Sequence, residues 1–190
     1  MSTIKTNAIQ TVAGKPILNS TGSILQVVQT VKTDTWSQTI GNGSWSSNSP
    51  TFATFYDVTG LNASITLSSA SNKILIMASV YTGGSANGWN HPWILKSNGS
   101  VLPIYGDTAS NRQRCAMDWR MNDNTSPMAD KRPVIINYLW SPGTTSAQTI
   151  TIAGRGTTNS TIYVNRSGRD NNSQDDCRPA SSLILMEISG

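Results

Sequence analysis

Apolar and polar residues alternate along several short stretches of the chain, most clearly between residues 56 and 82. Ile65 and Leu67 alternate with Ser and Thr, which is the two-residue period of a half-buried strand. Small turn-forming residues follow at 69–72, and residues 73–81 (KILIMASVY) are then almost all apolar. An apolar run this short and rich in β-branched residues predicts a central core strand. We expect the two strands to pair as a hairpin at the heart of the fold.

Further strands are predicted at intervals of roughly ten residues, with turn signals between them. The sequence Ser97-Asn98-Gly99-Ser100 is typical of a tight hairpin turn. No stretch has a helical period, so we predict an all-β protein with eight to ten strands: an antiparallel β-sandwich, specifically a jelly roll. The last apolar strand is expected to pair with the early ones. The other predicted strands are 24–31, 35–40, 89–96, 101–105, 112–120, 134–140, 148–153, 161–164 and 183–188.

The amino-acid composition supports the all-β fold class and argues against several classes of function. Ser, Thr and Asn make up 65 of the 190 residues, and these side chains favour strands and turns over helices. The net charge of +4 is spread along the chain, so no nucleic-acid partner is expected. Residues 1–22 lack the parts of a secretory signal, and no run of eighteen apolar residues occurs. We therefore expect synthesis in a cytoplasm and no membrane insertion.

The chain divides into an extended N-terminal arm, residues 1–22, and a single sandwich domain, residues 23–190. The arm has scattered apolar residues with neither a helical stripe nor a long alternating pattern. One interpretation is an arm that packs on neighbouring subunits or anchors the protein to a larger particle; the other is a frayed terminus. The candidate contact residues are Ile4, Ile9, Val12, Ile17 and Leu18.

Several segments resemble tail-fibre and related structural proteins of bacteriophages. They are the lead-in at 4–18, Tyr-Asp-Val-Thr-Gly-Leu at 56–61 with the strand pair after it, and the closing segments 161–167 and 180–188. The resemblance implies a non-enzymatic virion protein made in the host cytoplasm. It further implies a homotrimer with a jelly-roll head of the C1q and tumour-necrosis-factor type, which contacts other virion proteins and the host surface. The alternatives are a capsid decoration or head-fibre protein with the same fold and, less favoured, a polysaccharide-degrading tail protein.

The best candidate for receptor recognition is the cluster Trp89, Asn90, His91 and Trp93. Indole rings stack on sugar faces, and Asn and His supply hydrogen bonds to a host glycan. The competing interpretation is that the two Trp residues cap the core while His91 faces water. His91 is the sole histidine and no Gly-x-Ser-x-Gly motif accompanies it, so no catalytic residues are predicted.

A second candidate is the basic and aromatic stretch that contains Arg112, Arg114 and Trp119. It suits an anionic sugar, carboxylates of a neighbouring subunit, or simply a solvated face. On the predicted strand 112–120 the arginines at 112, 114 and 120 share one face and Trp119 lies on the other.

No metal or cofactor is expected. Asp170, Asp175 and Asp176 lack the spacing of a calcium loop and have arginines nearby as partners. Cys115 and Cys177 match no zinc spacing and are expected to be reduced, buried thiols, although a disulfide formed after release from the cell stays open.

Overall fold

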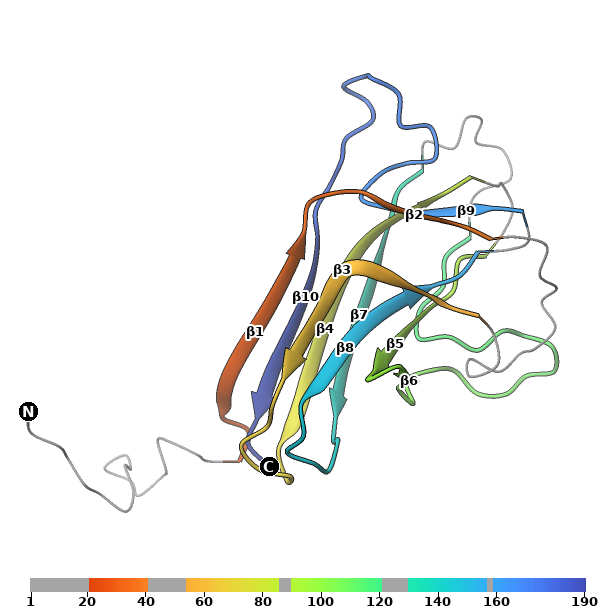
Figure 1. Ribbon diagram of the computed structural model, residues 1–190. Helices are drawn as coiled ribbons and strands as arrows, with labels where there is room; N and C mark the ends of the chain where they lie inside the picture. The colour runs from red at the N-terminus through yellow and green to blue at the C-terminus, as the bar shows by residue number, and fades with distance from the viewer. Residues whose placement is uncertain (1–20, 41–53, 86–89, 121–129, 157–158) are drawn as a thin grey trace, which may run out of the picture.

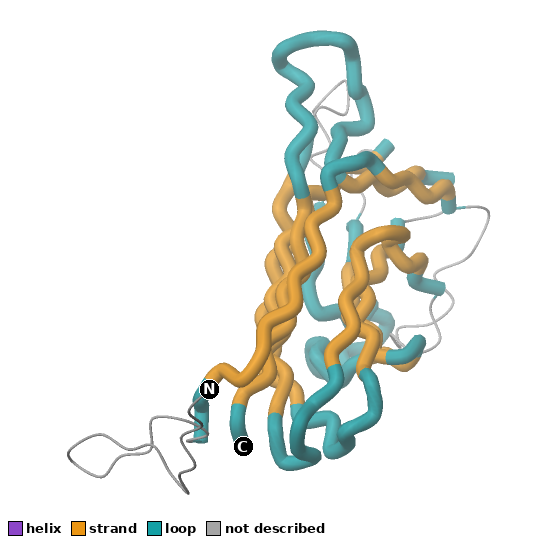
Figure 2. The backbone as a smooth tube through the Cα atoms, turned by 60° about the vertical axis from the view of Figure 1, so that its left-hand side comes forward, coloured by secondary structure: helices purple, strands orange, loops and turns teal. Residues whose placement is uncertain are grey.

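The computed structural model describes residues 21–40, 54–85, 90–120, 130–156 and 159–190, which form ten β-strands and, within these ranges, no helix. The strands stack as two antiparallel sheets with the core between them (Figures 1 and 2), so the predicted all-β sandwich is confirmed. The strands are β1 Ile24–Lys32, β2 Trp36–Thr39, β3 Tyr56–Ile65, β4 Lys73–Gly84, β5 Trp93–Ser97, β6 Ser100–Val101, β7 Arg132–Trp140, β8 Gln148–Gly154, β9 Thr161–Val164 and β10 Ser181–Ile188.

The strand order is that of a jelly roll. The six-stranded sheet has the order β1-β10-β4-β9-β2 with β7 also paired to β4, and the four-stranded sheet has the order β3-β8-β5-β6. Four antiparallel pairs are nested in the sequence, β1 with β10, β3 with β8, β4 with β7 and β5 with β6, and they alternate between the sheets. One long hairpin rolled into two sheets has this order. The final strand lies between β1 and β4, as predicted.

The predicted hairpin of β3 with β4 is wrong, because the two strands belong to different sheets. Ile65 on β3 and Ile74 on β4 both point into the common core, each almost fully buried. Residues 66–72 therefore cross from one sheet to the other. The turn-forming residues at 69–72 do make a turn, but it joins the sheets and not neighbouring strands.

A buried carboxylate fixes this crossing. Glu187 on β10 is 1% exposed and accepts hydrogen bonds from the backbone N and the Oγ of Ser68, at 2.7 Å each. It also accepts from Asn72 Nδ2 and from Gln26 Nε2, at 2.6 Å each. Burial alone would raise the pKa of the Glu187 carboxyl, but these hydrogen bonds outweigh it and lower the pKa to about 2. The side chain thus joins β1, β10 and the crossing at one end of the sandwich.

The predicted Asn-Gly turn is confirmed. Asn98 and Gly99 both have positive φ angles, 48° and 83°, as a two-residue hairpin of this type requires. The Asn98 side chain also accepts a hydrogen bond from Thr149 N at 3.0 Å, which ties the turn to β8.

The core contains one very close approach, between Trp93 on β5 and Gly154 on β8. The two residues are paired across the strands and Trp93 is fully buried. A Cβ atom on Gly154 would lie 2.5 Å from Cζ3 of the Trp93 ring, closer than any real contact.

Gly154→Ala is therefore expected to lower the free energy of unfolding by about 1–3 kcal/mol, since the buried ring must shift. Gly106→Ala is the matched control, because no atom lies within 4 Å of the position of its added Cβ. We expect the control to change stability by no more than about 0.5 kcal/mol. Denaturant midpoints compare the two; equal losses would contradict the packing described.

Residue 21 enters the fold beside the C-terminus, where Gly22 N donates to Ser189 O at 2.8 Å. The predicted contact residues Ile4, Ile9, Val12, Ile17 and Leu18 lie outside the described residues. Within the described ranges the chain has no helix able to cross a membrane.

Candidate assembly surface

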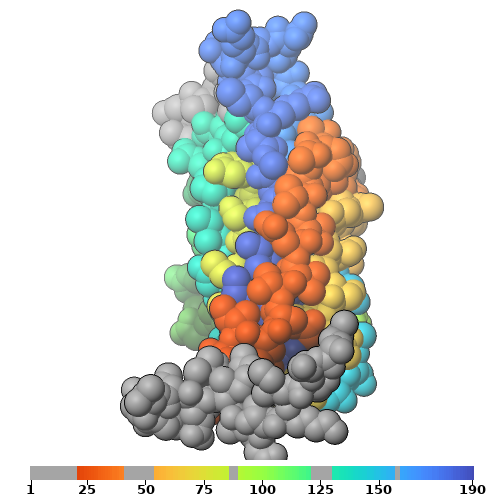
Figure 3. Space-filling model, turned by 90° about the vertical axis from the view of Figure 1, so that its left-hand side faces the viewer, coloured from red at the N-terminus to blue at the C-terminus, as the bar shows by residue number. Residues whose placement is uncertain are grey.

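The outer face of the six-stranded sheet, which points away from the core, is apolar across four adjacent strands. Val27 on β1 pairs with Met186 on β10, Met186 with Leu75 on β4, and Leu75 with Leu139 on β7. Paired residues point to the same side of a sheet, so these four side chains form a continuous apolar row. Figure 3 looks onto this face and shows β1, β10, β4 and β7 side by side.

Two neighbouring rows of cross-strand pairs on this face are also uncharged and contain further apolar side chains. The next row pairs Gln29, Ile184, Met77 and Asn137, and the one after it ends in Val31 and Ile135. Among the residues that the structure describes, seven of the eight exposed large hydrophobic side chains lie on this face; the eighth is Met117. The seven, with their exposed fractions, are Ile24 57%, Val27 56%, Val31 52%, Met77 37%, Tyr81 37%, Ile135 53% and Leu139 49%. We call this surface the outer apolar face.

The outer apolar face is almost free of charge. Among the outward positions of β1, β4, β7 and β10, Lys73 at one end is the sole charged residue, and the other polar residues are neutral Gln, Ser and Asn. An antiparallel sheet with one face in water normally alternates apolar and polar residues, whereas strands covered on both faces are apolar throughout. Contiguous apolar patches of this kind mark contact sites for other proteins. The pattern therefore indicates a surface that a partner covers.

The predicted recognition cluster lies mainly inside the fold. Trp93 and His91 are fully buried, and the His91 ring stacks on Trp119 with centroids 4.6 Å apart and an interplanar angle of 17°. Burial lowers the pKa of His91 to about 4, and no described residue gives its ring nitrogens a hydrogen-bond partner. Asn90 is exposed, and Trp89 lies outside the described residues. In this structure His91 does not face water, and neither buried ring is presented to a partner.

The predicted strand at 112–120 is wrong. The segment forms two isolated bridges, Asn90 with Arg120 and Trp93 with Met117, and no continuous ladder, and a turn closed by Arg112 N and Ala109 O stands at its start. The argument that its arginines share a strand face therefore does not apply.

The two arginines of that stretch lie in different environments. Arg112 is exposed, whereas Arg114 stacks over the Tyr105 ring at 4.4 Å and donates from Nε to Gly106 O at 2.7 Å. Trp119 is half-buried against His91. These residues do not converge on one site.

The segment 165–180 forms a long loop beyond the end of the sandwich opposite the C-terminus (Figure 2), and we call it the tip loop. Two carboxylates hold it together. Asp176 accepts from Arg169 Nε at 2.8 Å, Asn171 N at 2.9 Å and Ser167 Oγ at 3.1 Å.

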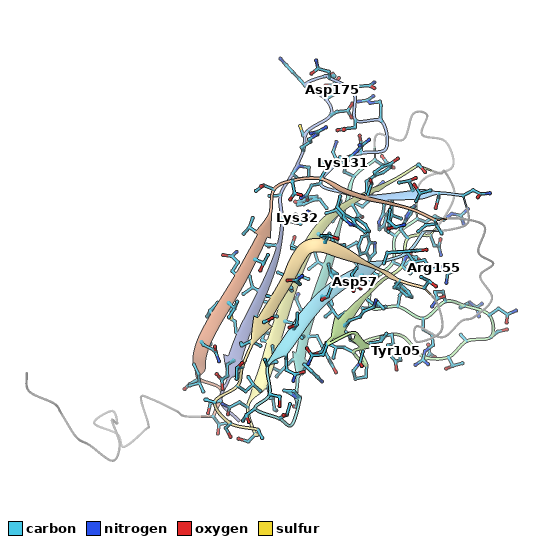
Figure 4. The ribbon with its side chains drawn as sticks, viewed as in Figure 1. Lys32, Asp57, Tyr105, Lys131, Arg155 and Asp175 are labelled. Atoms are coloured by element: carbon cyan, nitrogen blue, oxygen red, sulfur yellow. The ribbon has the colours of Figure 1, made fainter. Side chains whose placement is uncertain are left out.

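The second carboxylate, Asp170, accepts two hydrogen bonds from Arg178, at 2.6 and 3.0 Å. The bond from Arg169 lowers the pKa of Asp176, and that from Arg178 lowers the pKa of Asp170. Within the described residues, no group of His, Cys, Asp or Glu is placed to hold a metal ion. The tip loop is therefore ordered by its own ion pairs, and Figure 4 labels Asp175 at its end.

Both cysteines are free thiols. Cys115 is half-buried, and burial raises its thiol pKa to about 11. Cys177 is exposed on the tip loop, so the expectation of two buried thiols fails for this residue.

No family model and no curated protein matches the sequence. Among solved structures the chain is similar to three from infectious bursal disease virus, each at 11% identity. The Gt strain structure has a TM-score of 0.42 with 95% of this chain and 43% of that chain covered. The VP2 subviral particle has a TM-score of 0.38 with 86% and 37% covered, and the virus-derived T=1 particles have a TM-score of 0.40 with 96% and 41% covered. The chain thus spans less than half the length of these solved chains.

Proposed function

We propose that the protein is a non-enzymatic structural component of a bacteriophage virion, and that three copies assemble through their outer apolar faces. The observation that carries this proposal is the uncharged apolar surface of β1, β10, β4 and β7, with seven large side chains between 37% and 57% exposed. A sandwich needs one apolar face on each sheet, and this sheet has two. The second face has no use in an isolated copy.

A second copy of the same chain is the partner that this face fits best. Most soluble oligomers are closed, symmetric assemblies of identical copies, and in such an assembly every copy buries the same apolar surface. The centre of a stable interface is depleted of charge, as this face is. A partner of strongly acidic or basic character would find little to pair with apart from Lys73. The number three comes from the resemblance to phage fibre proteins.

Mass spectrometry of purified virus particles tests the virion role. The chain is expected in the particles at a copy number that is a multiple of three. Its presence in infected cells but not in particles would contradict the proposal. Labelled antibodies that mark the tail or the capsid separate a fibre from a decoration protein.

We further propose that the tip loop contacts the host surface. The outer end of this loop lies at the opposite end of the described fold from the C-terminus and the start of β1 (Figure 1). The carboxylates of Asp170 and Asp176 preorganise it, which lowers the entropic cost of binding. Exposed amide side chains at its end, including those of Asn172 and Gln174, suit the hydroxyl groups of a glycan.

Asn172→Ala together with Gln174→Ala is expected to slow adsorption of virus particles to host cells by about tenfold, because both side chains are exposed at the loop surface and neither is hydrogen-bonded to another described residue. Thr59→Ala, on the exposed face of the four-stranded sheet, is the control and should leave adsorption unchanged. Equal adsorption of both variants would place the receptor contact elsewhere.

A further inference from the structure

The tip loop folds around an open polar pocket, which we call the tip pocket. Its volume is about 330 Å³, at the lower end of the range of small-molecule binding sites. None of the residues that line it is apolar, so the lining gives a hydrophobic ligand no advantage over water. A ligand that displaces water here has to offer hydrogen-bonding groups in return. The lining residues are Asp170, Asn171, Asn172, Ser173, Asp176 and Arg178.

The charges around the tip pocket cancel. The tip loop carries three arginines and three aspartates. Arg178 donates two hydrogen bonds to Asp170, and Arg166 lies 3.4 Å from the same carboxylate. Arg169 pairs with Asp176 at 2.8 Å. Each arginine thus has a carboxylate partner. An anionic ligand would have to compete with these carboxylates for the arginines, and a cationic ligand would have to compete with the arginines for the carboxylates.

The hydrogen-bonding groups that stay open to a ligand are mainly uncharged amides. The side chains of Asn171 and Asn172 are exposed, and neither is hydrogen-bonded to another described residue. Each amide has both donor and acceptor atoms. Arg178 is 57% exposed, and its two bonds to Asp170 leave other N–H groups of the guanidinium available as donors. This set of groups matches a ligand whose own groups both donate and accept.

The backbone holds these amides in place before any ligand binds. Asn171 N donates to Asp176 Oδ2 at 2.9 Å, and Asn171 O accepts from Ser173 N at 2.8 Å. Ser173 O in turn accepts from Asp176 N at 3.1 Å. The main chain of residue 171 is therefore fixed on both sides while its side chain stays free. Such preorganisation lowers the entropic cost of binding.

We infer that the tip pocket binds a sugar ring of an uncharged saccharide, whose hydroxyl groups pair with Asn171, Asn172 and Arg178. Hydroxyl groups both donate and accept, as the open groups of the pocket do. The paired charges disfavour an acidic sugar, and the polar lining disfavours an apolar ligand. The inference rests on the proposed contact of the tip loop with the host surface and names the class of ligand at that contact.

A glycan array probed with the full-length protein tests the ligand class. Uncharged oligosaccharides and sialylated forms of the same oligosaccharides are displayed at equal density. The labelled protein is expected to bind at least one uncharged saccharide, and to bind its sialylated form at least about tenfold more weakly.

Asn171→Ala removes one amide of the tip pocket and keeps the backbone hydrogen bonds of the loop. It should weaken binding to the uncharged saccharide by about tenfold or more. Asn62→Ala is the matched control, because it removes an exposed asparagine on β3, outside the tip loop. This control should bind as the unmodified protein does.

Three array results would overturn the inference: a preference for the sialylated forms, equal binding by Asn171→Ala and the unmodified protein, or no binding to any saccharide. Adsorption of virus particles separates this inference from the proposed function. If Asn172→Ala with Gln174→Ala slows adsorption while the protein binds no saccharide, the tip loop contacts a host receptor of another class, such as a protein. If the array result is as expected and adsorption is independent of the loop, the saccharide site stands and the proposed host contact fails.

Discussion

Replacing both Met77 and Leu139 by glutamate is expected to convert the assembled protein into a folded monomer. Both side chains lie on the outer apolar face, 37% and 49% exposed, and neither packs in the core. In an assembly each copy would bury two new carboxylates with no cation to pair with them, and isolated buried charges cost several kcal/mol each. Affinity should fall by at least about a thousandfold, which corresponds to roughly 4 kcal/mol.

The matched control places the same two charges on the other sheet. Thr59 and Asn62 are exposed on β3, away from the core and from the outer apolar face. The variant Thr59→Glu with Asn62→Glu should keep the mass of the unmodified protein. Light scattering gives the masses, and far-ultraviolet circular dichroism checks that both variants are folded. A folded Met77→Glu, Leu139→Glu variant that keeps the unmodified mass would place the interface elsewhere.

Glu187→Ala is expected to lower the free energy of unfolding by about 3–5 kcal/mol. The change leaves donors from Ser68, Asn72 and Gln26 without their acceptor at a buried position, and breaking a buried charged network costs about this much. Ser69→Ala, in the same crossing but at an exposed position, is the control and should cost less than about 1 kcal/mol. Denaturant unfolding of the charged monomer variant avoids the contribution of assembly.

The same carboxylate gives the fold a defined response to acid. The pKa of Glu187 is about 2 in the folded protein against an ordinary value of 4.5. A lowered folded pKa stabilises the fold fully above pH 4.5, and this stabilisation is lost as pH falls toward 2. The loss should be about 3 kcal/mol. Glu187→Ala should remove this part of the pH dependence; an unchanged slope between pH 5 and 2 would contradict the role of the network.

Much of the strand content could be predicted from the sequence, because period-2 alternation and turn residues are local signals. Which strands pair is not local. The turn residues at 69–72 suit a hairpin and a crossing between sheets equally well, and the acceptor that fixes the crossing is Glu187, 115 residues beyond Asn72. The prediction of a strand at 112–120 was wrong for a related reason, since the backbone of this segment pairs at only two positions with residues 90–93.

The outer apolar face was not predicted, although its signal is in the sequence. The runs at 73–81 and 134–140 are apolar on both faces, and we interpreted them as core strands only. One face of each is core, as Ile76 and Ile136 show, while Met77 and Ile135 lie on the other face. Only the pairing of β1, β10, β4 and β7 shows that these second faces join into one surface.

The molar mass of the unmodified protein in solution tests the central claim most directly. Light scattering over a range of concentrations is expected to give three times the chain mass of 20.4 kDa. A mass of one chain at all concentrations would mean that the outer apolar face does not join copies of this protein, and would contradict the proposed assembly.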